Sequence, residues 1–242
     1  MKARLRGYAL WQIRDFMFER AAAILVVLVL LIWAMYEQTE VARTSVFVSR
    51  GIHAREFGAS VMATVISPSW FICALTAVYG LSSNDRTNGR FRLIFAKPVN
   101  VLSYYGQAFV LHGAMFVLCA ALALAVFTRL FPVTGNTVTG GLALFVLGYV
   151  LVGGVCFLFS AIWRFDWLST GALFGIVTYF ASIHPGARWL YPFPPFWIIA
   201  EQVTVLDKMR PLESKPLLWV GAYGVACFLL GLIILKRRPL AT

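Results

Sequence analysis

Residues 82–110 read SSNDRTNGRFRLIFAKPVNVLSYYGQAFV, and this stretch decides how the rest of the chain is arranged. It is the one strongly charged interior segment between two long apolar runs, and Gly89 and Pro98 interrupt it. Its charged residues are four basic and one acidic: Arg86, Arg90, Arg92, Lys97 and Asp85. Basic segments between apolar runs are typical of cytoplasmic loops in membrane proteins. The stretch therefore predicts a cytoplasmic loop, over about residues 83–103, that contains a short helix between two membrane spans.

The composition agrees with a protein whose main solvent is lipid. The 242 residues are 60% hydrophobic and only 13% charged, and the mean hydropathy is +0.79. A soluble domain carries about a quarter charged residues. The net charge of +11 is explained by basic loops that orient a membrane protein, so nucleic acid is not expected as a partner. The length fits a single transmembrane domain over residues 1–242.

Apolar runs of about 20 residues predict membrane-spanning helices. Six occur, at about residues 21–36, 57–81, 104–128, 138–163, 168–183 and 217–235. Small residues in the fourth run, among them Gly148 and Gly154, predict that this helix approaches its neighbours closely. The fold class is therefore an all-α integral membrane protein with six transmembrane helices.

Two segments flank these spans without crossing the membrane themselves. Residues 1–20 mix charged and large apolar side chains, which predicts an amphipathic helix in the headgroup layer. Residues 184–216 contain six prolines and many aromatic residues, so we expect an outer hairpin of short or re-entrant helices between the fifth and sixth spans. With the N-terminus inside, 13 lysines and arginines lie in the cytoplasm, Arg20 among them, and 8 lie outside. The positive-inside rule therefore places both termini in the cytoplasm.

The chain carries no sequence motif for an energy source of its own. No GxxxxGK[ST] phosphate loop occurs, and neither do the GxSxG and HExxH motifs of hydrolases. The predicted spans contain almost no ionisable groups, whereas ion-coupled carriers place such groups at mid-bilayer. A transporter of this kind must take its energy from a partner.

The order of residues in the charged loop resembles a known family. DRTNGRF at 85–91, KPVN at 97–100 and the Gly106–Gln107 pair resemble the permease subunits of ATP-binding-cassette (ABC) transporters of the type-two exporter class. The family pattern has an acidic residue, a glycine, a leucine-like run and a basic-Pro-Val-Ser phrase before the third span. Thr87 and Gln107 depart from it, standing where the family often has an acid and a lysine.

The resemblance implies a homodimer or close heterodimer of permeases on two separate ATPase subunits, which would hold ATP and magnesium. This chain would have no catalytic residue and would move a hydrophobic or amphipathic substrate across the cytoplasmic membrane. The ATPase-coupling residues would be Asp85, Arg86, Gly89, Arg90, Arg92, Lys97 and Pro98. In the family the second and fifth spans line the path, which gives as substrate-path residues Thr64, Ser67, Trp70, Phe71, Phe174, Thr178 and Tyr179.

Two alternatives stay open. His112, Met115 and Cys119 share one face of the third predicted span, and such soft ligands suit copper(I), although ordinary packing explains them better. The chain as a whole is alternatively a polytopic membrane enzyme or a membrane assembly scaffold. The sequence leaves open the cargo, the direction of transport, whether the two permeases are identical and whether accessory subunits are needed.

Overall fold

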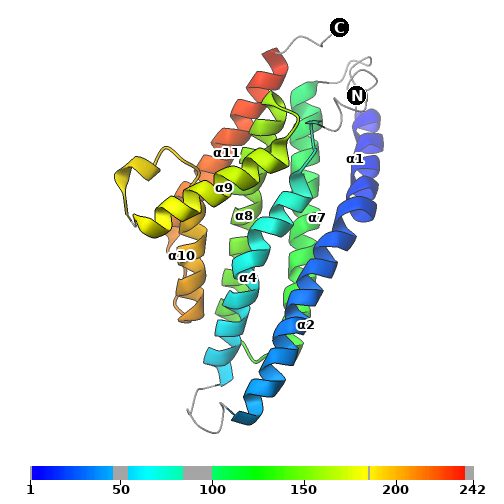
Figure 1. Cartoon of the computed structure of the whole chain (residues 1–242). Helices are drawn as coiled ribbons and strands as arrows, with labels where there is room; N and C mark the ends of the chain where they lie inside the picture. The colour runs from blue at the N-terminus through cyan, green and yellow to red at the C-terminus, as the bar shows by residue number, and fades with distance from the viewer. Residues whose placement is uncertain (1, 46–53, 84–99, 185, 238–242) are drawn as a thin grey trace.

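The structure is a computed structural model that describes residues 2–45, 54–83, 100–184 and 186–237 (Figure 1). Within these ranges the chain forms α-helices, one π-helical turn and one 3-10 turn, and it contains no β-strand. The all-helical fold predicted from the sequence is therefore confirmed for the described residues.

Five helical segments are long and apolar enough to cross a membrane. They are Tyr8–Gln38, which runs from α1 into α2, Arg55–Val78 in α4 (Ala54–Val78), and the whole of α7 (Val101–Leu130), α8 (Gly135–Ile162) and α11 (Ser214–Arg237). At 1.5 Å per residue, a helix of 24 residues is about 36 Å long, which exceeds the roughly 30 Å of a bilayer core. These segments match five of the six predicted spans and indicate a multi-pass membrane protein.

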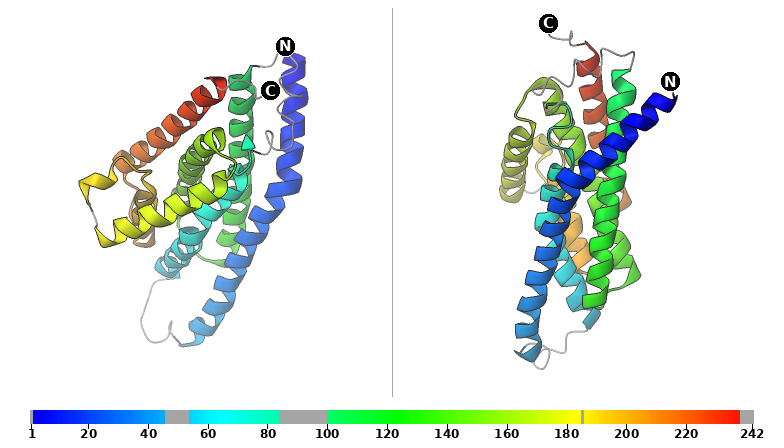
Figure 2. Two further views of the ribbon diagram at one scale, coloured as in Figure 1. Left: turned by 45° about the horizontal axis from the view of Figure 1, so that its top comes forward. Right: turned by 90° about the vertical axis from the view of Figure 1, so that its right-hand side faces the viewer.

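Helix α9 (Asp166–Ile183) occupies the fifth predicted span but differs from the others. It has 18 residues, or about 27 Å, and it is not among the five candidate spans. It also runs obliquely to the long helices (Figures 1 and 2). The helix is as predicted, while its role as a sixth span stays a prediction.

The N-terminal segment forms one uninterrupted helical rod. Helix α1 (Lys2–Phe16) passes through the π-helical turn η1 (Met17–Ala21) directly into α2 (Ala22–Ser45). The right-hand view of Figure 2 shows α1 inclined to α2 at this point. The candidate span described in this segment, Tyr8–Gln38, contains the predicted span at residues 21–36. The position of residues 1–20 in the headgroup layer stays a prediction.

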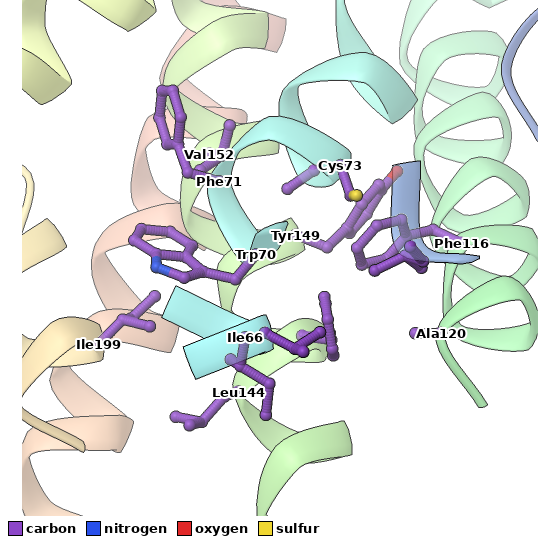
Figure 3. Close-up of a cluster of buried hydrophobic side chains, with 14 of the residues drawn as sticks. Ile66, Trp70, Phe71, Cys73, Phe116, Ala120, Leu144, Tyr149, Val152 and Ile199 are labelled. Atoms are coloured by element: carbon purple, nitrogen blue, oxygen red, sulfur yellow. The ribbon is translucent and has the colours of Figure 1, made fainter. Parts of the chain in front are cut away.

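Helix α8 forms the centre of the bundle and packs against α4, α7 and α11. Its glycines allow the close approach that the sequence predicts. Gly148 lies against the ring of Trp70 in α4, and the backbone of Gly154 lies against the backbone of Gly224 in α11. The core consists of apolar side chains from α4, α7, α8 and α10, including Ile66, Phe116, Leu144 and Ile199 (Figure 3).

The proline-rich segment forms short helices, as predicted. It contains the 3-10 turn η2 (Arg188–Leu190) and α10 (Phe196–Asp207), which packs against α4 and α8. Its assignment to the outer side and its re-entrant character stay predictions. The first residues of α1 and the last of α11 lie at the same end of the bundle (Figure 1).

Candidate functional site

The predicted ATPase-coupling residues lie outside the described part of the chain. All seven fall within residues 84–99: Asp85, Arg86, Gly89, Arg90, Arg92, Lys97 and Pro98. The structure does describe both flanks of this segment. Ser83 precedes it, and Asn100 follows it as the N-cap of α7, where its side chain accepts a hydrogen bond of 3.0 Å from the Leu102 N–H. On the α4 side, two buried charged side chains, Arg20 and Asp166, contact the backbone of this flank.

Helix α4 ends in a tight turn, residues 77–83, which we call the α4 terminal turn. The helix proper ends at Val78, and Gly80 then adopts a left-handed conformation with φ of +74°. Glycine suits this position because it has no Cβ to clash there. The Leu81 N–H donates to the Val78 carbonyl at 3.2 Å, which closes the turn and leads the chain towards residue 84.

A buried carboxylate from α9 holds the far side of this turn. Asp166, the first residue of α9, is 1% exposed. Its Oδ2 accepts hydrogen bonds from the Gly80 N–H at 2.9 Å and the Ser83 hydroxyl at 3.0 Å, and its Oδ1 accepts from the Trp167 N–H at 2.8 Å. A buried charge is tolerated when its lone pairs are satisfied in this way.

A buried guanidinium contacts the near side of the turn. Arg20, in the π-helical turn η1, is 4% exposed. Its Nη1 donates to the Ala77 carbonyl at 2.6 Å and lies 3.2 Å from Nδ1 of His112 in α7. Its Cζ also lies 5.3 Å from the centre of the Tyr79 ring. The cation therefore faces the carboxyl end of α4, where the helix dipole is negative.

The burial of Arg20 is a feature that the sequence analysis did not predict. Arg20 was placed among the cytoplasmic basic residues, which stays a prediction, and almost no ionisable groups were expected in the spans. The structure buries this arginine among the helices and brings it to His112. A signal was available: Gln12, Phe16 and Arg20 recur every four residues, so they share one helix face, and all three are buried.

The predicted substrate-path residues divide into two groups. Trp70 and Phe71 of α4 are buried and pack around Phe174 of α9. Phe196 of α10, which the sequence reasoning did not select, lies 5.4 Å from Phe174 between ring centroids. Figure 3 shows Trp70 and Phe71 within the buried cluster. We call these four rings the aromatic cluster.

The other four path residues do not join the aromatic cluster. Thr64, Ser67 and Tyr179 are exposed, and Thr178 is half-buried. The hydroxyls of Thr64 and Thr178 donate to backbone carbonyls one turn earlier in their own helices, at 2.9 Å and 2.6 Å. The resemblance selected these residues by the span in which they lie. The sequence did not show which faces of α4 and α9 meet, so it could not separate the exposed positions from the packed ones.

Of the three candidate copper ligands, His112 is in contact with other groups of the protein. His112 and Cys119 are buried in α7 and Met115 is half-buried. His112 Nδ1 already lies 3.2 Å from both Arg20 Nη1 and the Ala77 carbonyl, and a neighbouring cation repels a bound metal ion. Among the described residues no group of three or more His, Cys, Asp or Glu could hold a metal.

No protein-family model matches the chain, and no curated protein matches it. Function is therefore inferred from the residues and contacts of this chain.

Proposed function

We propose that the chain is the membrane-spanning subunit of an ABC exporter in the cytoplasmic membrane. In this proposal α9 is the fifth of six spans, α1 lies partly in the headgroup layer, α10 belongs to the outer hairpin, and both termini are cytoplasmic. ATP and magnesium are bound by separate ATPase subunits. The chain moves a hydrophobic or amphipathic substrate as one half of a permease dimer.

The observation that carries the proposal is where the basic segments emerge from the bundle. The first residues of α1, the end of α4 and the last residues of α11 lie at one end of the bundle (Figure 1). The sequence places its basic clusters next to these points: residues 2–6, 86–97 and 236–238. Basic residues at one face are typical of the cytoplasmic side and suit the binding of a soluble subunit. The resemblance of residues 85–107 to ABC permeases supports the same assignment.

Docking of an ATPase on residues 84–99 would act directly on α4 and α7, because these residues follow the α4 terminal turn and precede Asn100, the N-cap of α7. Movement passed through rigid helices is a common means of transmitting nucleotide-driven change. Helix α4 also carries Trp70 and Phe71, which contact Phe174 of α9. A push on the loop would therefore reach the aromatic cluster through a single helix.

Charge reversal in the loop tests the proposal. The full chain is purified from its native membrane with any bound ATPase subunit, and ATP hydrolysis is measured in proteoliposomes. We expect the R90E/R92E double variant to retain its helical content and to lose most of the permease-dependent hydrolysis. The matched control is Arg129→Glu, an exposed basic residue at the opposite end of α7, which should leave hydrolysis unchanged. Undiminished hydrolysis in R90E/R92E would remove the docking role.

The alternative is a polytopic membrane enzyme or an assembly scaffold. Arg20 and His112 do converge, but their contacting nitrogens are directed at the backbone of α4 rather than at an identified substrate space. A scaffold would not alter ATP turnover in a partner. Purified chain that is active in liposomes without an ATPase would favour the enzyme.

A further inference from the structure

Two buried side chains of opposite charge hold the α4 terminal turn from two helices. Arg20 belongs to η1, 57 residues before Ala77, and Asp166 belongs to α9, 86 residues after Gly80. Each charge meets the backbone group of opposite polarity: the guanidinium meets a carbonyl, and the carboxylate meets an N–H. The contacts therefore converge from two separate helical segments, η1 and α9, on the seven residues of the α4 terminal turn.

We propose that Arg20 and Asp166 are a pair of positioning residues, a charge clamp, that makes η1, the α4 terminal turn and the start of α9 shift as one unit. A movement of the turn would then be passed to both neighbouring helices. A change at either charge would likewise reach the helix that carries the other. The clamp rests on the described contacts alone, and only its use in transport depends on the proposed function.

The low polarity of the surroundings makes the clamp stronger than a surface contact. Electrostatic interactions strengthen as the effective dielectric constant falls, and both charged side chains are almost fully buried. Neither charge can leave its partners without being stranded in an apolar interior, which is costly. When the turn moves, each helix is therefore driven to follow it.

Two buried polar atoms at the α4 terminal turn lack a hydrogen-bond partner, which favours a second position of this turn. Nε of Arg20 and Oγ of Ser82 are buried without a hydrogen-bond partner, which is uncommon in folded proteins. A displacement of the turn that gave either atom a partner would be favoured by the bond gained. The π-helical turn that carries Arg20 is itself a feature that recurs at functional sites.

The imidazole ring of His112 has two alternative hydrogen-bonding states at the same turn. Arginine is only a donor, so the 3.2 Å contact with Arg20 Nη1 requires an unprotonated Nδ1. The 3.2 Å contact of the same Nδ1 with the Ala77 carbonyl requires a protonated one. The two contacts thus belong to alternative tautomers, and His112 can bond either to the arginine or to the α4 backbone.

Amide hydrogen exchange of the purified full chain in lipid nanodiscs tests the clamp without any ATPase. The variants are Arg20→Met, Asp166→Asn and the double substitution. Methionine keeps an unbranched apolar stem but removes the guanidinium group and its charge, and asparagine keeps the shape of aspartate but cannot accept at both positions. The matched control is Arg14→Met, an exposed arginine two turns earlier in α1.

We expect Arg20→Met and Asp166→Asn each to raise exchange of the residue 77–83 amides by tenfold or more. The double variant should exceed either single variant by less than threefold, because one release already frees the turn. The decisive result is the crossed effect: Asp166→Asn should raise exchange in Met17–Ala21, and Arg20→Met should raise it in the first turn of α9. Arg14→Met should change none of these.

Strictly local effects would overturn the clamp. If exchange rises only in the helix that carries the substitution, and the single effects multiply in the double variant, the two charges act independently. Should either neutral variant fail to fold, the same comparison is made with Arg20→Lys and Asp166→Glu, which keep the charges but shift their positions. Independent effects in that pair would be equally decisive. Loss of ATPase docking alone would leave the exchange result unchanged, so the two proposals fail separately.

Discussion

The ring of Phe71 in α4 stacks on the ring of Phe174 in α9, with centroids 3.8 Å apart and planes 17° apart. Trp70 and Phe196 meet Phe174 edge-on at 5.7 Å and 5.4 Å. Apart from the hydrogen bonds of Asp166, this stack is the principal side-chain contact described between α4 and α9. In the proposed exporter it would have to separate for substrate to pass between the second and fifth spans.

Truncation of Phe174 should loosen α9. A fully buried phenylalanine changed to alanine costs about 3–5 kcal/mol, and Phe174 is only half-buried, so we expect a loss of about 1–3 kcal/mol. This corresponds to a fall in Tm of roughly 2–4 °C per kcal/mol for a chain of this size. The measurement is thermal unfolding of the purified protein in one detergent. Tyr179→Ala is the control, because Tyr179 is 62% exposed on the same helix; equal shifts for the two variants would contradict the stack.

The purified chain should bind no stoichiometric copper(I). His112 is held beside the Arg20 cation, and loading a second positive charge next to it is unfavourable. Elemental analysis after reductive copper loading and gel filtration measures the bound metal, and a His112→Gln variant gives the background. One equivalent of copper in the wild type that disappears in His112→Gln would revive the metal site.

The long helices could be read from the sequence because each is a run of apolar residues of bilayer length. The shorter helices were harder to predict from the sequence. Helix α9 has the apolar character of a span but only 18 residues, so composition could not decide whether it crosses. The sequence predicted a helix on both sides of residue 20 but treated residues 1–20 as a separate segment, because Arg14, Glu19 and Arg20 appeared to end the apolar run.

The candidate site was predicted less well than the fold. Trp70, Phe71 and Phe174 were selected as substrate-path residues, which stays a prediction, and the structure shows their rings in contact. Phe196 was not selected, because the proline-rich segment gave no indication that its helix returns to the core. Apart from the Ser83 hydroxyl and the His112 ring, the described partners of Asp166 and Arg20 are backbone groups. Any residue supplies such groups, so no pattern of residue types could have predicted these pairs.

Acidification should slightly stabilise the α10 region. Burial, and after it the nearby Glu213 carboxylate, raise the pKa of Glu201 above its usual value. A carboxyl whose pKa is raised by folding destabilises the folded state while ionised, so stability rises as pH falls through the raised pKa. Thermal unfolding between pH 7 and pH 5 should show a small rise in Tm. Glu201→Gln should flatten that rise and Glu56→Gln, an exposed acid in α4, should not; identical slopes in all three proteins would contradict the assignment.

The contact of α8 with α11 should be the least tolerant of added volume. A Cβ on Gly154 would meet the backbone carbonyl of Gly224, and a Cβ on Gly224 would meet that of Val150. A backbone cannot rotate away as a side chain can, so the two helices would have to separate. Overpacking of this kind costs about 1–3 kcal/mol, and we expect Gly154→Ala and Gly224→Ala to lie at the upper end of that range.

Gly175→Ala in α9 is the matched control, because a Cβ there meets no atom within 4 Å. Alanine is the better helix former by about 1 kcal/mol, so this variant should be neutral or slightly more stable. The three variants are compared by thermal unfolding in one detergent and by chemical cross-linking between cysteines introduced into α8 and α11. Destabilisation in Gly154→Ala and Gly224→Ala with none in Gly175→Ala requires direct backbone contact between the two helices, since helix propensity alone predicts the opposite sign. Equal stability of all three would mean that α8 and α11 are separated by more than the described contact allows.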